Sequence, residues 1–210
     1  MSNEFKSLRL GNLTIELPII QGGMGVRISA SSLASAVANE GALGVIAAVA
    51  LGEERGNEKV DFNKRSRAAF IDCIRKTRSL TKNPFGVNIM CALANYDDLV
   101  DAAQVESVDV IISGAGLPLK LPSLIKNDKT KLVPIVSSSR AARIICSVWK
   151  RRYKRLPDAI VVEGPLAGGH LGYSMAELKD EKHVFLDKIL QEVLEVTREF
   201  ENDKLKIPVI

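Results

Sequence analysis

The sequence predicts an α/β fold built around a parallel β-sheet, and three observations support this prediction. Short apolar runs rich in Val and Ile alternate with longer stretches of helical periodicity, as they do in βαβ units. The runs are continuously apolar, which is typical of parallel strands that are covered on both faces. Glycine and small polar residues gather at the carboxyl ends of the runs. This asymmetry favours a barrel or an open sheet with one functional face.

Seven apolar runs are expected to form the strands of this sheet. They span residues 18–21, 43–48, 85–90, 108–113, 132–137, 159–163 and 207–210. Pro134 lacks a backbone donor, so we expect it at the start of the fifth strand. A domain rarely ends on an uncovered apolar strand. Because the 210-residue sequence stops inside the seventh run, we expect a single domain over residues 1–210 that is truncated there and incomplete.

Five amphipathic stretches fill the gaps between the runs and are expected to be helices. They span residues 29–39, 63–80, 95–105, 139–153 and 181–200. Serines at the start of the first helix are available as caps, and Gly41 is expected to stop it. Asn95 is expected to cap the third helix. Ser137, Ser138 and Ser139 either cap the fourth helix or contact a phosphate or another ligand.

Composition and charge indicate an ordinary soluble globular protein. Hydrophobic residues make up 46% and charged residues 26% of the chain. The net charge of +4 is too diffuse to indicate nucleic acid by itself. The basic run at residues 150–155 lies at the end of the fourth predicted helix. We expect it to be a solvated helix end, where cations complement the dipole, with an acidic partner or nucleic acid as the alternative.

The cysteines and the N-terminus indicate a cytoplasmic protein. The three cysteines are widely spaced and form no Cys-x-x-Cys pair, so no zinc site or disulfide framework is expected. Scattered single thiols fit a reducing compartment. The sequence has no basic segment followed by a long apolar stretch at its start, and no apolar run near the length of a membrane helix.

The most informative stretch is the glycine-rich loop after the sixth run, residues 163–172. It contains four glycines and His170, one of two histidines in the chain. Glycines allow the backbone to approach a ligand closely or to adopt a positive φ. Histidine exchanges protons near neutral pH, so His170 is a candidate proton donor or acceptor. The alternative is a glycine turn with a surface histidine, and the spacing alone leaves both open.

Three other features lie at the carboxyl ends of the predicted strands. Residues 21–25, Gln-Gly-Gly-Met-Gly, follow the first run but lack the Gly-x-Gly-x-x-Gly spacing of a dinucleotide-binding loop. Asn88 lies inside an apolar run, and its amide either bonds to the backbone or points at a polar ligand. Glu163 ends the sixth run, where a carboxylate must be paired or solvated.

Three motifs together resemble the nitronate monooxygenase family, also called 2-nitropropane dioxygenases, and the related flavin-dependent enoyl-acyl-carrier-protein reductases. They are Pro-Ile-Ile-Gln-Gly-Gly-Met-Gly at 18–25, Gly-Val-Asn-Ile at 86–89 and Ala-Gly-Gly-His-Leu-Gly at 167–172. They occur in the expected order, and the match extends over residues 13–172. The resemblance implies a TIM (β/α)8 barrel that binds FMN at its carboxyl face. It also implies phosphate-binding segments after strands seven and eight, which would lie beyond residue 210.

The resemblance also assigns roles to individual residues. His170 is implied to act beside the flavin ring as a base or as a substrate-positioning group. Glutamine is common at the position of Glu163, so the carboxylate is a departure or a subgroup trait that would affect the electronics of the flavin. The residues implied to contact FMN are Gly22, Gly23, Met24, Asn88, Glu163, Gly168 and Gly169.

The function implied by the resemblance is that of an FMN-dependent flavoprotein oxidoreductase acting on a small molecule. The leading expectation is a nitronate monooxygenase that oxidises alkyl nitronates or nitroalkanes with O2. The alternative on the same scaffold is a quinone or enoyl-ACP reductase with NAD(P)H as electron donor. An alternative of another class is a non-catalytic partial-barrel binding module or fragment. No metal, nucleic acid or membrane partner is expected, and a homodimer is left open.

Overall fold

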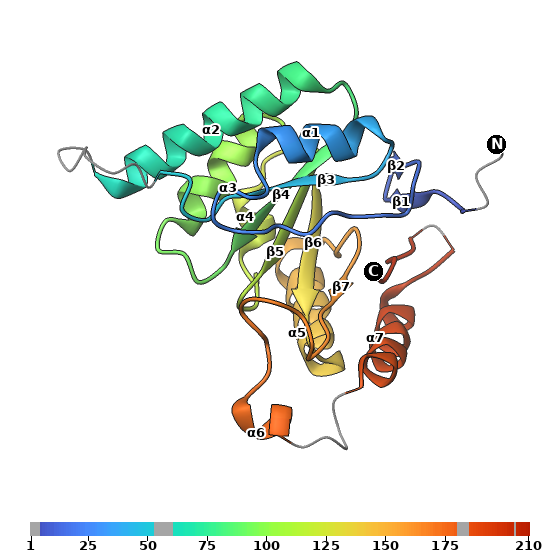
Figure 1. Ribbon diagram of the computed structural model, residues 1–210. Helices are drawn as coiled ribbons and strands as arrows, with labels where there is room; N and C mark the ends of the chain where they lie inside the picture. Colours follow the sequence, from blue (N-terminus) through green and yellow to red (C-terminus); the bar gives the residue numbers. More distant parts are fainter. Residues whose placement is uncertain (1–4, 53–60, 180–184, 204) are drawn as a thin grey trace.

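The computed structural model describes residues 5–52, 61–179, 185–203 and 205–210. An antiparallel hairpin precedes a five-stranded parallel sheet in which β3, β4, β5, β6 and β7 follow one another in chain order (Figure 1). The strands are β1 Leu8–Leu10, β2 Leu13–Ile15, β3 Gly44–Ala47, β4 Phe85–Met90, β5 Val110–Gly114, β6 Lys131–Val136 and β7 Val161–Val162. The helices are α1 Ser31–Asn39, α2 Phe62–Leu80, α3 Tyr96–Val105, α4 Leu121–Leu124, α5 Ser139–Tyr153, α6 Met175–Lys179 and α7 Leu186–Phe200. The α/β class and the parallel sheet are therefore confirmed.

The first and last predicted strands pair with the sheet as isolated parallel bridges. Ile20 bridges to Leu43 beside β3, and Val209 bridges to Ile160 beside β7. Two hydrogen bonds support the bridge at Val209. The N–H of Ile160 donates to the carbonyl of Pro208, and the N–H of Ile210 donates to the carbonyl of Ile160, each at 2.9 Å. Both segments thus lie where the sequence places them, in the order that the wall of a β/α barrel requires.

Gln21 explains why the first predicted strand stops after one bridge. Its N–H donates to the carbonyl of Leu43 at 3.0 Å, which is the last ladder bond of the segment. The next donor on β3, the N–H of Val45, bonds to the side-chain oxygen of Gln21 at 3.0 Å. A side chain therefore takes the place of the backbone, and the chain is free to leave the sheet.

The two faces of the sheet form two separate cores. The outer core lies between the sheet and the helices and includes Phe70 on α2, Leu99 on α3 and Trp149 on α5. Figure 1 shows α1 and α2 along one side of the sheet, with α5 and α7 beyond its other end. The inner core is formed by alternate strand residues and the hairpin: Leu10, Ile15, Leu43, Val45, Val110, Ile112, Val133 and Ala159. Strands buried on both faces explain the continuous apolar runs.

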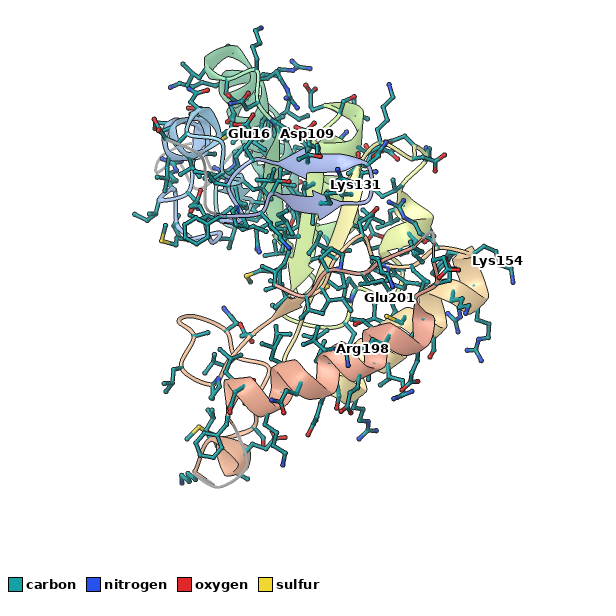
Figure 2. All side chains as sticks on the ribbon, turned by 90° about the vertical axis from the view of Figure 1, so that its right-hand side faces the viewer. Glu16, Asp109, Lys131, Lys154, Arg198 and Glu201 are labelled. Atoms are coloured by element: carbon teal, nitrogen blue, oxygen red, sulfur yellow. The ribbon has the colours of Figure 1, made fainter. Side chains whose placement is uncertain are left out.

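The β1–β2 hairpin closes the inner face, and no strand was expected there. Leu8 and Ile15 are paired at one end and Leu10 and Leu13 at the other. Gly11 in the turn has φ +59°, a conformation that favours glycine. Figure 2 shows the hairpin crossing in front of the sheet beside Lys131 at the start of β6. The hairpin thus covers the amino end of the inner core and leaves the carboxyl end of the sheet to the loops.

A buried charge cluster lies beneath the hairpin. Lys131 is 6% exposed, and its ammonium lies 4.0 Å from the carboxylate of Asp158. Asp158 also accepts from Arg155 at 3.1 Å and from the N–H of Leu132 at 2.9 Å. One carboxylate therefore balances the buried ammonium and joins the start of β6 to the segment before β7.

The predicted helices have the expected positions but not all of the expected caps. α5 is capped as predicted, because the hydroxyl of Ser138 accepts the N–H of Ala141 at 3.2 Å. α1 begins at Ser31 and has no side-chain cap, and Asn95 precedes α3 without a capping bond. The last predicted helix begins at Leu186 in the structure, and residues 181–184 lie outside the described part. None of the helices in the described ranges is both long and apolar enough to cross a bilayer.

Two short helices, α4 and α6, were not predicted. They have four and five residues, about one turn each, which is too short for an amphipathic period to show in a sequence. The basic run at residues 150–155 lies as expected at the end of α5, with Lys150, Arg151 and Arg152 in its last turn. Trp149 is fully buried in the outer core.

Candidate active site

A cavity lies at the carboxyl edge of the sheet, where the loops after β5, β6 and β7 meet. It encloses about 420 Å³ and is lined by Gly116 after β5, Ser137 and Ser138 after β6, and Glu163 and His170 after β7. Parallel strands bring all of their carboxyl ends to one edge, and this is where α/β proteins bind ligands. Four of the residues singled out in the sequence therefore line one cavity: Ser137, Ser138, Glu163 and His170.

The loop that carries His170, residues 164–172, is attached to the sheet at its last residue, Gly172. The N–H of Gly172 donates to Oε2 of Glu163 at 3.1 Å, and the carbonyl of Gly172 accepts from Oγ of Ser137 at 2.8 Å. The hydroxyl of Tyr173 donates to the carbonyl of Glu163 at 2.5 Å. Burial raises the pKa of this phenol, and the charge of Glu163 adds to the effect. Tyr173 therefore stays a neutral donor.

The loop after the first bridge, residues 21–29, is organised around a buried serine. Ser29 is fully buried, and its hydroxyl accepts the N–H of Met24 at 2.9 Å and a side-chain N–H of Gln21 at 2.7 Å. The same hydroxyl donates to the carbonyl of Gly22 at 3.0 Å. Ser29 was expected among the serines available to cap the first helix. It holds this loop instead, which explains why α1 begins two residues later without a side-chain cap.

Gly23 lies directly against Asn88 on β4. A Cβ added to Gly23 would lie 2.5 Å from Cβ of Asn88, whereas a Cβ added to Gly22 would meet nothing within 4 Å. Among the described residues, no group hydrogen-bonds to the half-buried side chain of Asn88. Of the two alternatives for this amide, the bond to the neighbouring backbone is thus not found. The contact also gives a physical reason for glycine at position 23.

The predicted site residues therefore fall into groups along the same edge. His170 and Glu163 line the cavity, while Gly168 and Gly169 lie in the exposed part of the His170 loop and do not line it. Gly169 has φ +92°, as expected for a glycine turn. Gly23 lies against Asn88 on β4, Gly22 and Met24 belong to the same loop as Gly23, and none of these four residues lines the cavity. Their roles toward a ligand stay predictions.

A buried polar cluster beside the cavity was missed by sequence reasoning. The hydroxyl of Ser113 donates to the carbonyl of Ile89 at 2.9 Å and bonds to the hydroxyl of Tyr96 at 2.9 Å. The thiol of Cys91 lies 3.3 Å from the hydroxyl of Ser113. Burial raises the pKa of both the Cys91 thiol and the Tyr96 phenol, so both groups stay protonated. The signal was a serine at position 113 inside an apolar run.

Comparisons with known proteins identify what this chain is similar to. A family model described as nitronate monooxygenase matches residues 6–106 and 94–210. A (3aS,4S,5R,7aS)-5-hydroxy-7a-methyl-1-oxo-octahydro-1H-indene-4-carboxyl-CoA dehydrogenase from Mycobacterium tuberculosis is 29% identical over 75% of this chain and 38% of its own length. A nitronate monooxygenase from Pseudomonas aeruginosa is 26% identical over 80% of this chain and 53% of its own length. The chain therefore spans about half or less of these curated relatives.

Solved structures give the same picture at the level of the fold. FabK from Thermotoga maritima superposes with a TM-score of 0.64 at 30% identity, over 93% of this chain and 50% of that chain. A nitroalkane oxidase from Streptomyces ansochromogenes superposes with a TM-score of 0.69 at 21% identity, over 93% of this chain and 58% of that chain. The second likeness concerns the fold alone. The sheet described above is thus a parallel half-barrel of five strands within a fold that larger proteins share.

Proposed function

The chain belongs to the nitronate monooxygenase family of oxidoreductases, and from this premise we propose that it works in an FMN-dependent oxidoreductase acting on a small organic molecule. The observation that carries the proposal is the placement of Glu163 and His170 on one cavity at the carboxyl edge of the sheet. A proton-transfer group and a carboxylate in a concave site are typical of an active site. Because the chain spans about half of its relatives, the activity is proposed for the whole protein.

The residues present fit a planar cofactor with polar edges. Gly23 lies against Asn88 and Gly22 has open space around it, so at Gly22 the backbone of this loop can approach a ring closely. The side-chain amide of Asn88 has no hydrogen-bond partner within the described ranges and offers both a donor and an acceptor to such an edge. We propose that Gly22, Gly23, Met24, Asn88, Glu163, Gly168 and Gly169 would hold the flavin. A bound flavin supplies the electron acceptor that no amino-acid side chain provides.

The protein's own contribution is orientation and proton transfer. We propose that His170 removes the proton from the carbon next to the nitro group of a nitroalkane, or orients a nitronate that has already lost it. Glu163 lies on the same cavity and brings a carboxyl group to its wall. The small residues of the cavity, such as Gly116, leave room for a substrate of modest size.

A second candidate function is a reductase or dehydrogenase acting on an acyl thioester, with NAD(P)H as the other redox partner. The observation that favours it is the identity of the relatives. A carboxyl-CoA dehydrogenase at 29% identity and FabK at 30% identity match at least as well as the nitronate monooxygenase at 26%. The same cavity would then receive the carbon atoms beside the thioester. A quinone reductase is a variant of this second candidate. A non-catalytic binding module is the third candidate function.

The first experiment is a visible absorbance spectrum of the purified full-length gene product. We expect a flavin spectrum, with FMN released on denaturation. Nitronate-dependent O2 consumption would then support the monooxygenase, and oxidation of NAD(P)H that depends on an enoyl thioester would support the reductase. A protein that retains no flavin after incubation with FMN and removal of the free FMN contradicts both the monooxygenase and the reductase, and favours the binding module.

The variant His170→Ala tests the proposed role of the histidine. We expect it to keep the flavin and to lose turnover by about 10²- to 10⁴-fold, the usual contribution of a general acid or base. Retention of flavin is read from the spectrum, and turnover from steady-state kinetics with the active substrate. Unchanged turnover would show that His170 does not take part in the reaction.

A further inference from the structure

The position of His170 depends on how the ends of its loop are attached. Glu163, just before the loop, donates its N–H to the carbonyl of Val136 on β6 at 2.8 Å. Among the described residues, no hydrogen bond or ion pair joins residues 165–171 to the sheet or to a helix. Their one bond runs from the N–H of Ala167 to Gly164 inside the loop. Leu166 is 98% exposed. The attached ends of the loop, at Glu163 and at Gly172, therefore set where the imidazole lies.

Beside the bond from the Tyr173 hydroxyl to the carbonyl of Glu163, the far end of the loop is held at one residue, Gly172. Its N–H bonds to Glu163 at the end of β7, and its carbonyl bonds to Ser137 at the end of β6. A side chain at position 172 would overlap Oγ of Ser137 and would lie 3.0 Å from its Cβ. Only glycine fits between these two residues. The aromatic ring of the next residue, Tyr173, packs against the outer core and secures the chain beyond it.

We propose that Glu163 is a positioning residue, because its carboxylate and the hydroxyl of Ser137 clamp the Gly172 peptide and so fix the loop that carries His170 over the cavity. Glu163, Ser137, Gly172 and His170 all line this cavity. The clamp joins the loop to the ends of two neighbouring strands, which are the rigid part of the site. The proposal rests on the proposed function only for the role of His170, since the clamp itself is independent of it.

Two substitutions at position 163 separate the clamp from the charge. Glu163→Gln removes the charge but keeps a side-chain oxygen that can accept the N–H of Gly172. Glu163→Met has a similar length and no good acceptor. A carboxylate that acts only through its charge predicts the same loss for both variants. The clamp predicts that glutamine keeps the Gly172 amide bonded and that methionine does not.

The first readout is hydrogen exchange at the Gly172 amide, which needs no activity. We expect exchange in Glu163→Met to be about tenfold faster or more, because a charge-assisted hydrogen bond is lost, and exchange in Glu163→Gln to stay near that of the wild type. The matched control is Glu177→Met. Glu177 also accepts a backbone N–H of this segment, that of Ser174 at 2.7 Å, but does not line the cavity. This control should leave the Gly172 amide protected.

The second readout is a double-mutant cycle with His170→Ala. Glu163→Met should lower kcat on the order of 10- to 100-fold, since misplacing a catalytic group by about 1 Å has such an effect. Compared at equal flavin content, the combination with His170→Ala should cause no further loss. Ser137→Ala, which removes the other half of the clamp, should behave in the same way. It keeps the test available if the methionine variant fails to fold.

Two results would overturn the proposal. If the Gly172 amide exchanges equally fast in the wild type and in Glu163→Met, the clamp does not exist in solution. If the losses from Glu163→Met and His170→Ala multiply, Glu163 acts independently of the histidine. A protein without any flavin-dependent turnover would instead contradict the proposed function, and the exchange experiment would still decide the clamp.

Discussion

At the scale of single residues, Gly23 is a position where the structure leaves no space for a side chain. The Cβ of an alanine there would lie 2.5 Å from Cβ of Asn88, much closer than carbon atoms pack. Either the loop or the strand residue must move. The neighbouring Gly22 has open space around it. The two glycines therefore differ in what they allow, although the sequence presents them as an identical pair.

We predict that Gly23→Ala destabilises the protein by about 1–3 kcal/mol, the usual effect of overpacking a fitted contact. Gly22→Ala is the matched control and should change the free energy of unfolding by less than about 0.5 kcal/mol. Urea denaturation measures both variants. Equal stability of the two variants would mean that the loop is not seated against Asn88.

The candidate site was predictable only in part from the sequence. His170 and Glu163 were recognisable because a glycine-rich loop with a histidine follows an apolar run, and the structure places both on one cavity. Ser29 and Tyr173 were not, because a serine before a helix looks like a cap and a tyrosine in a loop looks solvated. Their roles depend on partners 5 to 10 residues away in the chain, which no local pattern specifies.

At the scale of the elements, the sequence predicted the helices and strands that are long enough to show a hydrophobic pattern. Strand β4 and helix α5 have the predicted bounds, because a six-residue run rich in apolar side chains and a helical pattern of about four turns are both clear in a sequence. The hairpin has strands of three residues and was missed. Its signal was present in the Gly11-Asn12 pair between Leu-Arg-Leu and Leu-Thr-Ile, since Gly-Asn between alternating residues is a hairpin turn.

The charge cluster under the hairpin leads to a prediction about the start of β6. Asp158→Ala removes the carboxylate beside Lys131, which is 6% exposed, and leaves a buried ammonium without a counter-charge. We predict a loss of stability of about 3–5 kcal/mol. The control is Asp97→Ala, which breaks the exposed pair of Asp97 and Lys120 at 2.8 Å and should cost about 0–1 kcal/mol.

Denaturant titration of both variants measures this difference. A loss of less than about 1 kcal/mol for Asp158→Ala would mean that water reaches Lys131 or that Arg155 and the hairpin rearrange around it. Asp158→Asn should lie between the two, because its side-chain oxygen can still accept the N–H of Leu132.

At the scale of the whole molecule, one thiol lies where only global opening can expose it. Cys146 on α5 is fully buried in the outer core, and burial raises the pKa of its thiol to about 12. A raised pKa keeps the thiol protonated, and the thiolate is the reactive form. At pH 8 two effects should therefore prevent modification of Cys146 in the folded protein: the reagent cannot reach the buried thiol, and the thiol stays protonated.

We predict that a disulfide reagent at pH 8 modifies Cys146 only at the rate of global unfolding. Cys73 and Cys91 are half-buried and should react earlier, through local opening. Mass spectrometry of the modified peptides assigns each rate, and adding urea should accelerate Cys146 in step with the loss of global stability. If Cys146 reacts as fast as Cys91, α5 opens on its own and the outer core is not one cooperative unit.

The hairpin over the inner core also has a consequence for the order in which the chain folds. Outer-core contacts join elements that are near neighbours in the sequence, such as α1 with β3. The inner core instead brings Leu10 and Ile15 against Val110, Val133 and Ala159, over separations of roughly 100 residues or more. Closing loops of that size costs conformational entropy before any contact repays it. The inner core should therefore form last. The amino-terminal hairpin is synthesised first but should dock only after the rest of the sheet has formed.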